Sequence, residues 1–195
     1  MRSVFFEMGD GGLREVPNPS EMLLSGRPQH APGTCVACIM EGTRPLLAEV
    51  QALVTKTTFN VPRRTANGFD YNRAVLLLAV LEKRGGLHLG TFDGYINVVG
   101  GLSLDEPAAD LPVALAVASS YRDKPVAQDL AAVGEIGLAG EVRAVSHLSL
   151  RLGEIARLGF TRCIIPRSGT EAMEAPNGLE LIRVRNVREA IEFAL

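Results

Sequence analysis

The chain has 195 residues, of which 47% are apolar and 22% are charged, and its formal net charge at pH 7 is −2. This length and apolar content suffice for one substantial hydrophobic core with an appended segment. The near-neutral charge excludes a bulk nucleic-acid polycation and a disordered acidic tail, so any nucleic-acid contact must come from locally clustered cations.

The sequence does not predict a membrane segment. The longest wholly apolar run covers residues 74–81, far short of the roughly 20 residues that cross a bilayer. Glu7 comes early and no long apolar core follows Arg2, so no signal peptide is predicted. Three cysteines, an odd number, fit a reducing compartment. We therefore expect a cytoplasmic protein.

The amino-terminal segment predicts a hairpin, a short helix and a linker. Residues 5–16 form the expected hairpin, because the glycines within residues 9–12 permit the positive φ of a tight turn. Asn18 and Pro19 suit the cap and the first position of a helix. The stretch 25–33 contains two prolines, two glycines and His30, which indicate a linker into the main domain.

The middle of the chain predicts strands and one amphipathic helix. Strands are expected at 35–40, 45–54 and 95–99. Asn67 and Asp70 offer helix caps, and the spacing of apolar residues from Val75 to Glu82 predicts a helix that ends at Gly85.

The carboxy-terminal half predicts three further helices, capped by Asp110, Ser146 and Asn186, the first of which runs to Tyr121. Strands are expected at 131–136, 141–145, 160–165 and 179–184. Strands followed by helices in this order predict an α/β or α+β fold.

Cys35 and Cys38 form a Cys-x-x-Cys pattern, which raises metal or redox chemistry as an alternative. They lie in a continuous apolar run suited to a buried strand, where positions three apart point to opposite faces. The sequence has no second pair that would complete four zinc ligands. We therefore interpret both as structural and predict no metal site here.

The acidic residues Asp105, Glu106 and Asp110 could together bind a hard cation. The sequence supplies no matching ligand set elsewhere, and carboxylates near a helix amino terminus are explained by capping and by the helix dipole. We therefore expect these residues to stabilise the start of a helix.

The segment 56–73 concentrates cations and aromatic rings. It contains Lys56, Arg63, Arg64 and Arg73 with Asp70 as its single acid. Phe59, Phe69 and Tyr71 are interleaved with them. Arginine pairs with phosphate and aromatic rings stack on bases, so the segment suits a DNA-facing surface. The alternative is a solvated loop whose aromatic side chains anchor it to the core. Weaker DNA-contact candidates are Arg122, Lys124 and Arg162.

Several unusual strings occur in a fixed order and carry a family resemblance. They are Leu13-Arg-Glu-Val-Pro-Asn-Pro-Ser-Glu21, Glu41-Gly-Thr-Arg-Pro-Leu-Leu47, Pro62-Arg-Arg-Thr65, Asn67-Gly-Phe-Asp-Tyr-Asn-Arg73, Leu81-Glu-Lys-Arg84, Asp105-Glu-Pro-Ala-Ala-Asp110 and Gly134-Glu-Ile-Gly137. From about Val4 onward the chain resembles the carboxy-terminal, Lon-protease-like domain of the bacterial RadA (Sms) family of DNA repair and recombination proteins. The resemblance narrows the expected fold to that of the Lon proteolytic domain.

The resemblance implies a longer protein with a four-cysteine zinc module, a RecA-like ATPase core and the Lon-like domain. No Gly-x-x-x-x-Gly-Lys-[Ser/Thr] loop occurs in this sequence, so ATP, Mg and Zn are expected only in the domains outside it. We expect residues 1–33 to be the remnant of the ATPase core with its linker, and 34–195 to be the Lon-like domain. The implied partners are single-stranded DNA, further copies in a ring, hexameric by resemblance, and recombinases or helicases.

The resemblance also implies a lost peptidase. Where Lon-type peptidases carry the serine nucleophile this chain has Ala108, and where they carry the lysine it has Ser149. A Ser-Lys dyad needs both groups, because the hydroxyl becomes nucleophilic only when a neighbouring amine accepts its proton. A substitute built from Ser103, Ser146 or Ser149 with His147 as base is disfavoured. Neighbouring helical residues do not face each other, and no third residue is available to orient the imidazole. We therefore expect no peptidase activity, with an active Lon-like peptidase and a purely structural ring-former as alternatives.

Overall fold

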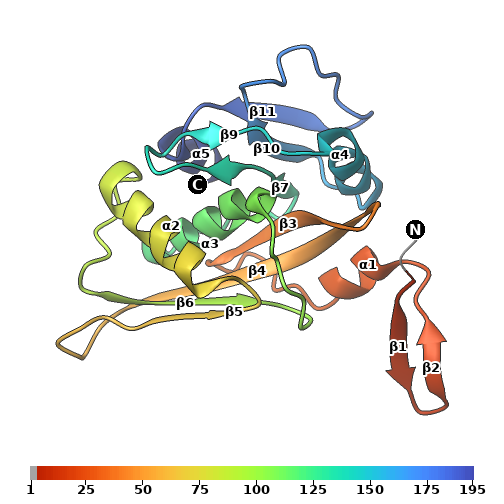
Figure 1. Cartoon of the computed structure of the whole chain (residues 1–195), viewed down its shortest axis with the longest axis horizontal. Coiled ribbons are helices and arrows are strands. Elements are labelled where there is room, and N and C mark those ends of the chain that lie inside the picture. Colours follow the sequence, from red (N-terminus) through yellow and green to blue (C-terminus); the bar gives the residue numbers. More distant parts are fainter. Residues whose placement is uncertain (1–3) are drawn as a thin grey trace.

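The structure, a computed structural model, describes residues 4–195. The first three residues of the predicted segment 1–33 lie outside the described part. The chain folds into a mixed α/β domain with a detached amino-terminal hairpin (Figure 1). The predicted α/β class is confirmed. Within the described residues, no helix is long and apolar enough to cross a membrane.

The main sheet has seven strands in the order β11-β10-β7-β3-β4-β6-β5. Its strands are β3 (Thr34–Glu41), β4 (Arg44–Lys56), β5 (Arg64–Asn67), β6 (Phe92–Val98), β7 (Leu130–Ala132), β10 (Arg162–Pro166) and β11 (Glu180–Val184). β4 pairs antiparallel with β3 and β6, and every other pairing in the sheet is parallel. Six strands therefore start at the end of the sheet where β4 finishes.

The helices cover both faces of this sheet. They are α1 (Pro19–Leu24), α2 (Tyr71–Arg84), α3 (Asp110–Arg122), α4 (Leu148–Arg157) and α5 (Val187–Ala194), with a 3-10 turn η1 (Pro107–Ala109) before α3. The larger core cluster joins one sheet face to α2, α3 and α5. The smaller cluster joins the other face to α4 and η1. Successive side chains of β3 point to opposite faces of the sheet, so this strand contributes to both clusters. Cys35 and Ala37 belong to the larger cluster, and Val36 and Cys38 belong to the smaller one.

The amino-terminal hairpin consists of β1 (Phe6–Gly9) and β2 (Gly12–Glu15), as the glycine-rich turn predicted. All eight strand residues are exposed, and Figure 1 shows the hairpin standing away from the main sheet. The boundary between residues 33 and 34 stays a prediction.

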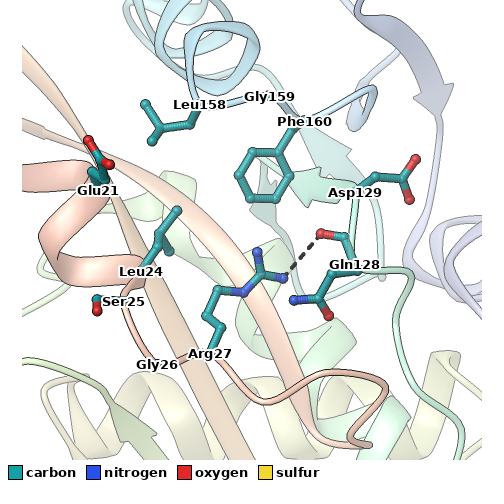
Figure 2. Close-up of a pocket in the computed structure, with 10 residues that line it drawn as sticks. All are labelled: Glu21, Leu24, Ser25, Gly26, Arg27, Gln128, Asp129, Leu158, Gly159 and Phe160. Atoms are coloured by element: carbon teal, nitrogen blue, oxygen red, sulfur yellow. Dashed lines mark hydrogen bonds between the residues drawn. The ribbon is translucent and has the colours of Figure 1, made fainter.

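The predicted linker is ordered against the main domain. The Arg27 guanidinium lies 5.3 Å from the ring centroid of Phe160, and its Nη2 donates to the carbonyl oxygen of Gln128 at 3.2 Å (Figure 2). At the linker's end, the amide of Gly33 donates to Ser119 Oγ on α3 at 2.9 Å. These bonds tie residues 25–33 to elements about one hundred positions away.

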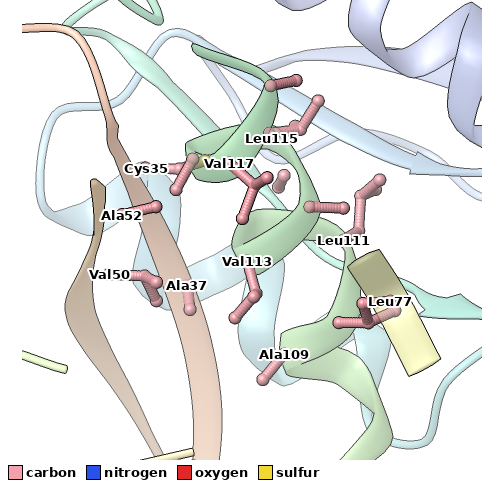
Figure 3. Packing of buried hydrophobic residues seen from close by; sticks show 14 of the residues in the cluster. Cys35, Ala37, Val50, Ala52, Leu77, Ala109, Leu111, Val113, Leu115 and Val117 are labelled. Atoms are coloured by element: carbon pink, nitrogen blue, oxygen red, sulfur yellow. The ribbon is translucent and has the colours of Figure 1, made fainter. Parts of the chain in front are cut away.

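Helix α3 is the centre of the larger core. Its residues from Asp110 to Ser119 are all buried, and Figure 3 shows it packed between strands β3 and β4 on one side and Leu77 of α2 on the other. Alanines at 114, 116 and 118 allow the helix backbone to approach its neighbours closely. A helix that is apolar all round is buried on every side, as here.

Most predicted elements are confirmed, with four differences. Strand β5 was not predicted, because its exposed residues were interpreted as part of a loop. The predicted strand 131–136 is split into β7 and β8 (Glu135–Ile136), and β8 leaves the main sheet to pair with β9 (Val142–Arg143). Gly134 lies at the break, with Val142 Cγ1 only 2.8 Å from where a β-carbon would stand.

Two helix caps were wrong. The cap position of α3 is Ala109 and that of α4 is His147, and neither Asp110 nor Ser146 caps a helix with its side chain. His147 adopts φ 55°, in the left-handed region, instead of the helical conformation that we predicted. Asn18 does precede α1, but its side chain bonds Glu21 and Arg157 instead of a backbone amide. The caps at Asp70 and Asn186 are confirmed.

Candidate functional site

Ala108, at the position where the resemblance places the nucleophile of Lon-type peptidases, is packed into the core. Ala108 lies in η1 and is 2% exposed. Its neighbours in the smaller cluster include Leu148 and Leu152 of α4, and its carbonyl oxygen accepts from the amide of Gly134 at 3.2 Å. Ser149, on the first turn of α4, is exposed. A methyl group therefore fills the place where a dyad would need a reactive hydroxyl.

The alternative serines have no activating partner in the described part of the chain. Ser103, Ser146 and His147 are all exposed. Ser146 uses its carbonyl oxygen to accept from Arg151 Nε at 2.8 Å, and no hydrogen bond joins the His147 ring to a serine hydroxyl among the described residues. Within the described residues, neither Ser103 nor Ser146 is therefore paired with the His147 ring in the way that acyl transfer requires.

A buried arginine holds one side of the η1 segment. Arg151, on α4, is 1% exposed and forms an ion pair with both carboxylate oxygens of Glu106. Its Nη1 also donates to the carbonyl oxygen of Cys38 at 2.8 Å. All of its donor directions point into the protein, so the side chain links α4, β3 and the segment before η1.

A second ion pair holds the other side. Asp110 is 1% exposed and forms a bidentate pair with Arg73 of α2, which is 29% exposed. Asp110 also accepts from the amide of Ile136 at 3.0 Å, and Arg73 donates to the carbonyl oxygen of Ile136 at 2.6 Å. The hydrogen bonds that Arg73 donates to the Asp110 carboxylate raise the pKa of Arg73 above its ordinary value.

These two pairs overturn the predicted capping roles of the Glu106 and Asp110 side chains, although Asp110 does lie in the first turn of α3 as the dipole interpretation requires. Each carboxylate neutralises a guanidinium from another element, so the pairs clamp residues 106–110 on both sides of Ala108. Removing either partner would leave a charge without compensation. The two ion pairs therefore give Glu106 and Asp110 a structural role.

A cavity of about 340 Å³ adjoins the clamp. Asp70, Arg73, Asp105, Glu106, Asp110 and Glu135 supply its charged lining. No cluster of three or more histidine, cysteine, aspartate or glutamate residues suited to a metal ion occurs within residues 4–195.

The three cysteines are free and buried. Cys35 and Cys38 lie in the two different core clusters, on opposite faces of β3, as the strand interpretation predicted. Burial raises the pKa of the Cys35 thiol to about 12 and raises that of Cys38 further. Thiols of this kind stay protonated and unreactive near neutral pH. The structural interpretation is confirmed.

Six of the seven DNA-contact candidates gather at one end of the sheet. Lys56 ends β4, and Arg63 and Arg64 are at the start of β5. Arg162 begins β10 at the same end, because β10 runs opposite to β4. Arg122 is the last residue of α3, and Lys124 lies two positions later. The hydroxyl oxygen of Ser120 accepts from the amide of Val54 at 2.9 Å, which ties this end of α3 to the same end of the sheet. We call this set the basic edge: Lys56, Arg63, Arg64, Arg122, Lys124 and Arg162.

Arg73 is the exception. It pairs with Asp110 at the opposite end, beside the clamp, so the structure does not bring it together with the basic edge. The basic edge and the clamp around Ala108 therefore lie at opposite ends of the sheet.

The side chains of the basic edge differ in whether they already bind other groups of the protein. Lys56, Arg63, Arg122 and Lys124 are exposed, and no ion pair involving them occurs in the described residues. Arg64 donates to the carbonyl oxygens of Phe92 and Leu89, the latter at 3.0 Å. Arg162 forms a bidentate pair with Asp129, which lowers the pKa of that carboxyl to about 2. Four cations are thus free to meet an anionic partner.

The predicted aromatic surface is present only in part. Phe59 is 48% exposed and lies under the Arg63 guanidinium, 3.7 Å from its ring centroid. Figure 1 shows their connection between β4 and β5 extending beyond the sheet. Phe69 is 6% exposed and packs in the core, and Tyr71 begins α2 at the other end. The core-anchoring alternative is therefore correct for Phe69.

Sequence reasoning missed Arg27 and Asp129. Arg27 packs on Phe160, and Asp129 neutralises Arg162. Both residues make contacts with positions far away in the sequence: Arg27 and Gln128 are 101 positions apart, and Asp129 and Arg162 are 33 apart. No local sequence pattern indicates such a pairing.

The comparisons with known proteins agree with the fold. The family defined as Lon protease (S16) C-terminal proteolytic domain matches residues 92–195. The DNA repair protein RadA of Bacillus subtilis (strain 168) is 50% identical over 190 residues, covering 97% of this chain and 42% of that protein. RadA of Streptococcus pneumoniae (strain ATCC BAA-255 / R6) is 49% identical over 187 residues, covering 96% of this chain and 44% of that protein.

The chain spans less than half the length of these relatives. Its similarity to them covers nearly all of its own length and confirms the resemblance that the motifs indicated. The chain therefore belongs to the Lon protease C-terminal proteolytic domain family.

Proposed function

We propose that this chain is a non-proteolytic Lon-like domain that serves a RadA-type DNA repair ATPase as oligomerisation scaffold and DNA-contacting platform in homologous recombination. The observation that carries the proposal is the separation of the two ends of the sheet. One end has a methyl group in place of the nucleophile, and the other presents four unpaired cations beside an exposed aromatic ring.

The loss of peptidase chemistry is supported by the burial of Ala108 and by the clamp. Removing the nucleophile of a serine protease costs a factor on the order of 10⁶ in rate. We expect no turnover of an unfolded protein substrate by the purified chain. Turnover that disappears on changing Ser103, Ser146 or Ser149 to alanine would restore the peptidase alternative.

The DNA contact is supported by the chemistry of the basic edge. Unpaired lysine and arginine side chains release counterions from phosphate, and an exposed ring offers a stacking surface for a base. Six cations at one end of one chain would make a weak site. Several such edges around a ring would act together and raise the affinity through effective concentration.

Fluorescence anisotropy with labelled single-stranded DNA at several salt concentrations tests this contact. The double variant Arg122→Gln/Lys124→Gln should bind more weakly, with a salt slope lower by about 1.4, because each lost phosphate contact removes about 0.7. The matched control Arg143→Gln/Arg185→Gln removes the same charge from the far end of the sheet. Arg143 is the last residue of β9, and Arg185 directly follows β11. Equal losses in both variants would contradict the assignment of the contact to the basic edge, and no binding by the unmodified chain would favour the purely structural ring-former.

A further inference from the structure

A cavity of about 440 Å³ opens at the basic edge, beside the Arg162–Asp129 pair (Figure 2). Its walls come from α1 and the segment after it, from the residues before β7, and from the turn between α4 and β10. Leu24 and Leu158 give it apolar surface. Figure 2 shows the side chains of Arg27 and Gln128 side by side along it.

Arg27 is incompletely satisfied by the protein. Its guanidinium lies against Phe160, and burial lowers its pKa below the ordinary value. Its Nη2 bonds the Gln128 carbonyl oxygen, whereas Nε is buried without any partner, the one such side-chain atom in the described residues. A buried donor without a partner is rare in native proteins and calls for an explanation. A desolvated guanidinium at the wall of a cavity favours a ligand that brings hydrogen-bond acceptors.

The charges of the lining argue against a phosphate as this ligand. Glu21 and Asp129 also line the cavity, and the charge of Asp129 is offset by Arg162. Glu21 carries the opposite charge to Arg27, and the buried carboxylate of Glu49 also interacts with Arg27, so the cavity has no excess positive charge for a phosphate. The Gln128 side-chain amide, which makes no hydrogen bond within the described residues, adds both a donor and an acceptor. The cavity therefore suits an uncharged ligand with apolar faces and a polar edge.

We propose that this cavity accepts one unstacked nucleobase of a DNA strand whose phosphates lie along the basic edge. The base packs against the leucine side chains, and its polar edge meets the Arg27 guanidinium and the Gln128 amide. Single-stranded nucleic acids are commonly recognised in this way, with bases turned out of the strand onto side-chain surfaces. The inference rests on the proposed DNA contact and specifies where a base is held.

The test compares a single-stranded oligonucleotide with an abasic strand of the same length and the same number of phosphates. This chain should bind the base-bearing strand about thirtyfold more tightly, the middle of the range for one stacked base. The salt slopes of the two strands should agree, because the phosphate contacts are the same. Arg27→Gln and Gln128→Ala should each bring the affinity ratio towards one while leaving abasic binding unchanged.

Arg44→Gln is the matched control. Arg44 also stacks on a ring, that of Phe5 at 5.8 Å, and donates to a backbone carbonyl oxygen, that of Pro17 at 3.2 Å, but it lies at the opposite end of the sheet. This variant should keep the full ratio, and thermal unfolding of all three variants checks that they are folded.

Three outcomes overturn the inference. The first is a ratio near one in the unmodified chain. The second is a ratio that survives both cavity variants, or that disappears only with Phe59→Ser, which would assign the base to the exposed ring. In both cases the proposed DNA contact stands. Failure to bind either strand overturns the proposed contact itself, and the inference with it.

Discussion

The two side chains that flank Ala108 have a structural role. Glu106 and Asp110 each pair their carboxylate with a guanidinium from a different helix. Pairs of this kind contribute modest net stability, but each makes the loss of one partner costly. The side chains nearest Ala108 therefore fix the relative positions of α2, α4 and η1.

Asp110→Ala tests this clamp. The change leaves the Arg73 guanidinium and the Ile136 amide without their acceptor, so we expect the free energy of unfolding to fall by about 2–4 kcal/mol. Urea unfolding followed by circular dichroism measures it. Arg143→Ala breaks the exposed Arg143–Glu141 pair, at 3.5 Å, and should cost less than about 1 kcal/mol. A similar loss of unfolding free energy in both variants would show that the buried Arg73–Asp110 pair contributes no more than the exposed pair.

Asp129 makes stability depend on acid pH. Hydrogen bonds from Arg162 and then Thr161 lower its pKa to about 2, below its ordinary value of 3.8. Its stabilising effect is therefore complete above pH 4 and is lost as pH falls from about 4 to about 2. Because both side chains of the Arg162 pair are partly exposed, solvent screening should limit the effect to about 1 kcal/mol.

Asp129→Asn should remove this contribution. The variant and the unmodified chain are compared by urea unfolding at pH 5 and at pH 2.5. The difference between them should be largest at pH 5 and clearly smaller at pH 2.5, where part of the contribution has been lost. A difference that grows towards acid would contradict the assignment.

At the scale of elements, local patterns predicted what local physics determines. The hairpin turn, the Asp70 and Asn186 caps and the long strands β3 and β4 depend on residues close in sequence, and all are present. Strand β5 was missed because its residues alternate only weakly between half-buried and exposed, and its pairing with β6 depends on positions about thirty residues away.

The caps at Asp110 and Ser146 failed for a related reason. An aspartate or serine before a helix suits a cap, but a guanidinium from another element can offer the carboxylate a stronger partner. Arg73 and Asp110 are 37 positions apart, so a single sequence gives no sign of their pairing. The gathering of the basic edge escaped prediction likewise, because it depends on the strand order.

Two glycines with positive φ allow a test of how the linker docks. At Gly33, with φ 87°, an added β-carbon would stand 2.4 Å from the carbonyl oxygen of Ala52. At Gly26, with φ 81°, the same atom would meet nothing within 4 Å. Gly26→Ala should therefore cost about 1 kcal/mol from backbone strain alone, whereas Gly33→Ala should cost about 2–4 kcal/mol. Thermal or urea unfolding compares them, and equal costs would show that the linker can retreat from β4.

At the scale of the whole molecule, the sheet separates two regions with different chemistry. Its strand-start end presents the free cations, and its other end contains the clamp and the buried methyl group. A ligand at the basic edge would therefore leave the clamp untouched. In a ring, the same arrangement would direct every basic edge to an equivalent position relative to the axis.

The mass of this chain in solution, with and without single-stranded DNA, tests the scaffold role. If the chain assembles, sedimentation should show a species several times 20.9 kDa whose DNA affinity exceeds that of the dilute monomer. A chain that stays monomeric in both conditions would require the scaffold role to reside in other parts of the longer protein.

The complete burial of α3 has a consequence for opening motions. Amides between Val113 and Ser119 are enclosed by strands on one side and helices on the other, so no local fraying can bring them to solvent. Their hydrogen–deuterium exchange should proceed only when the entire domain opens, and their rates would report its global free energy directly. Amides of the exposed β1–β2 hairpin should exchange many orders of magnitude sooner.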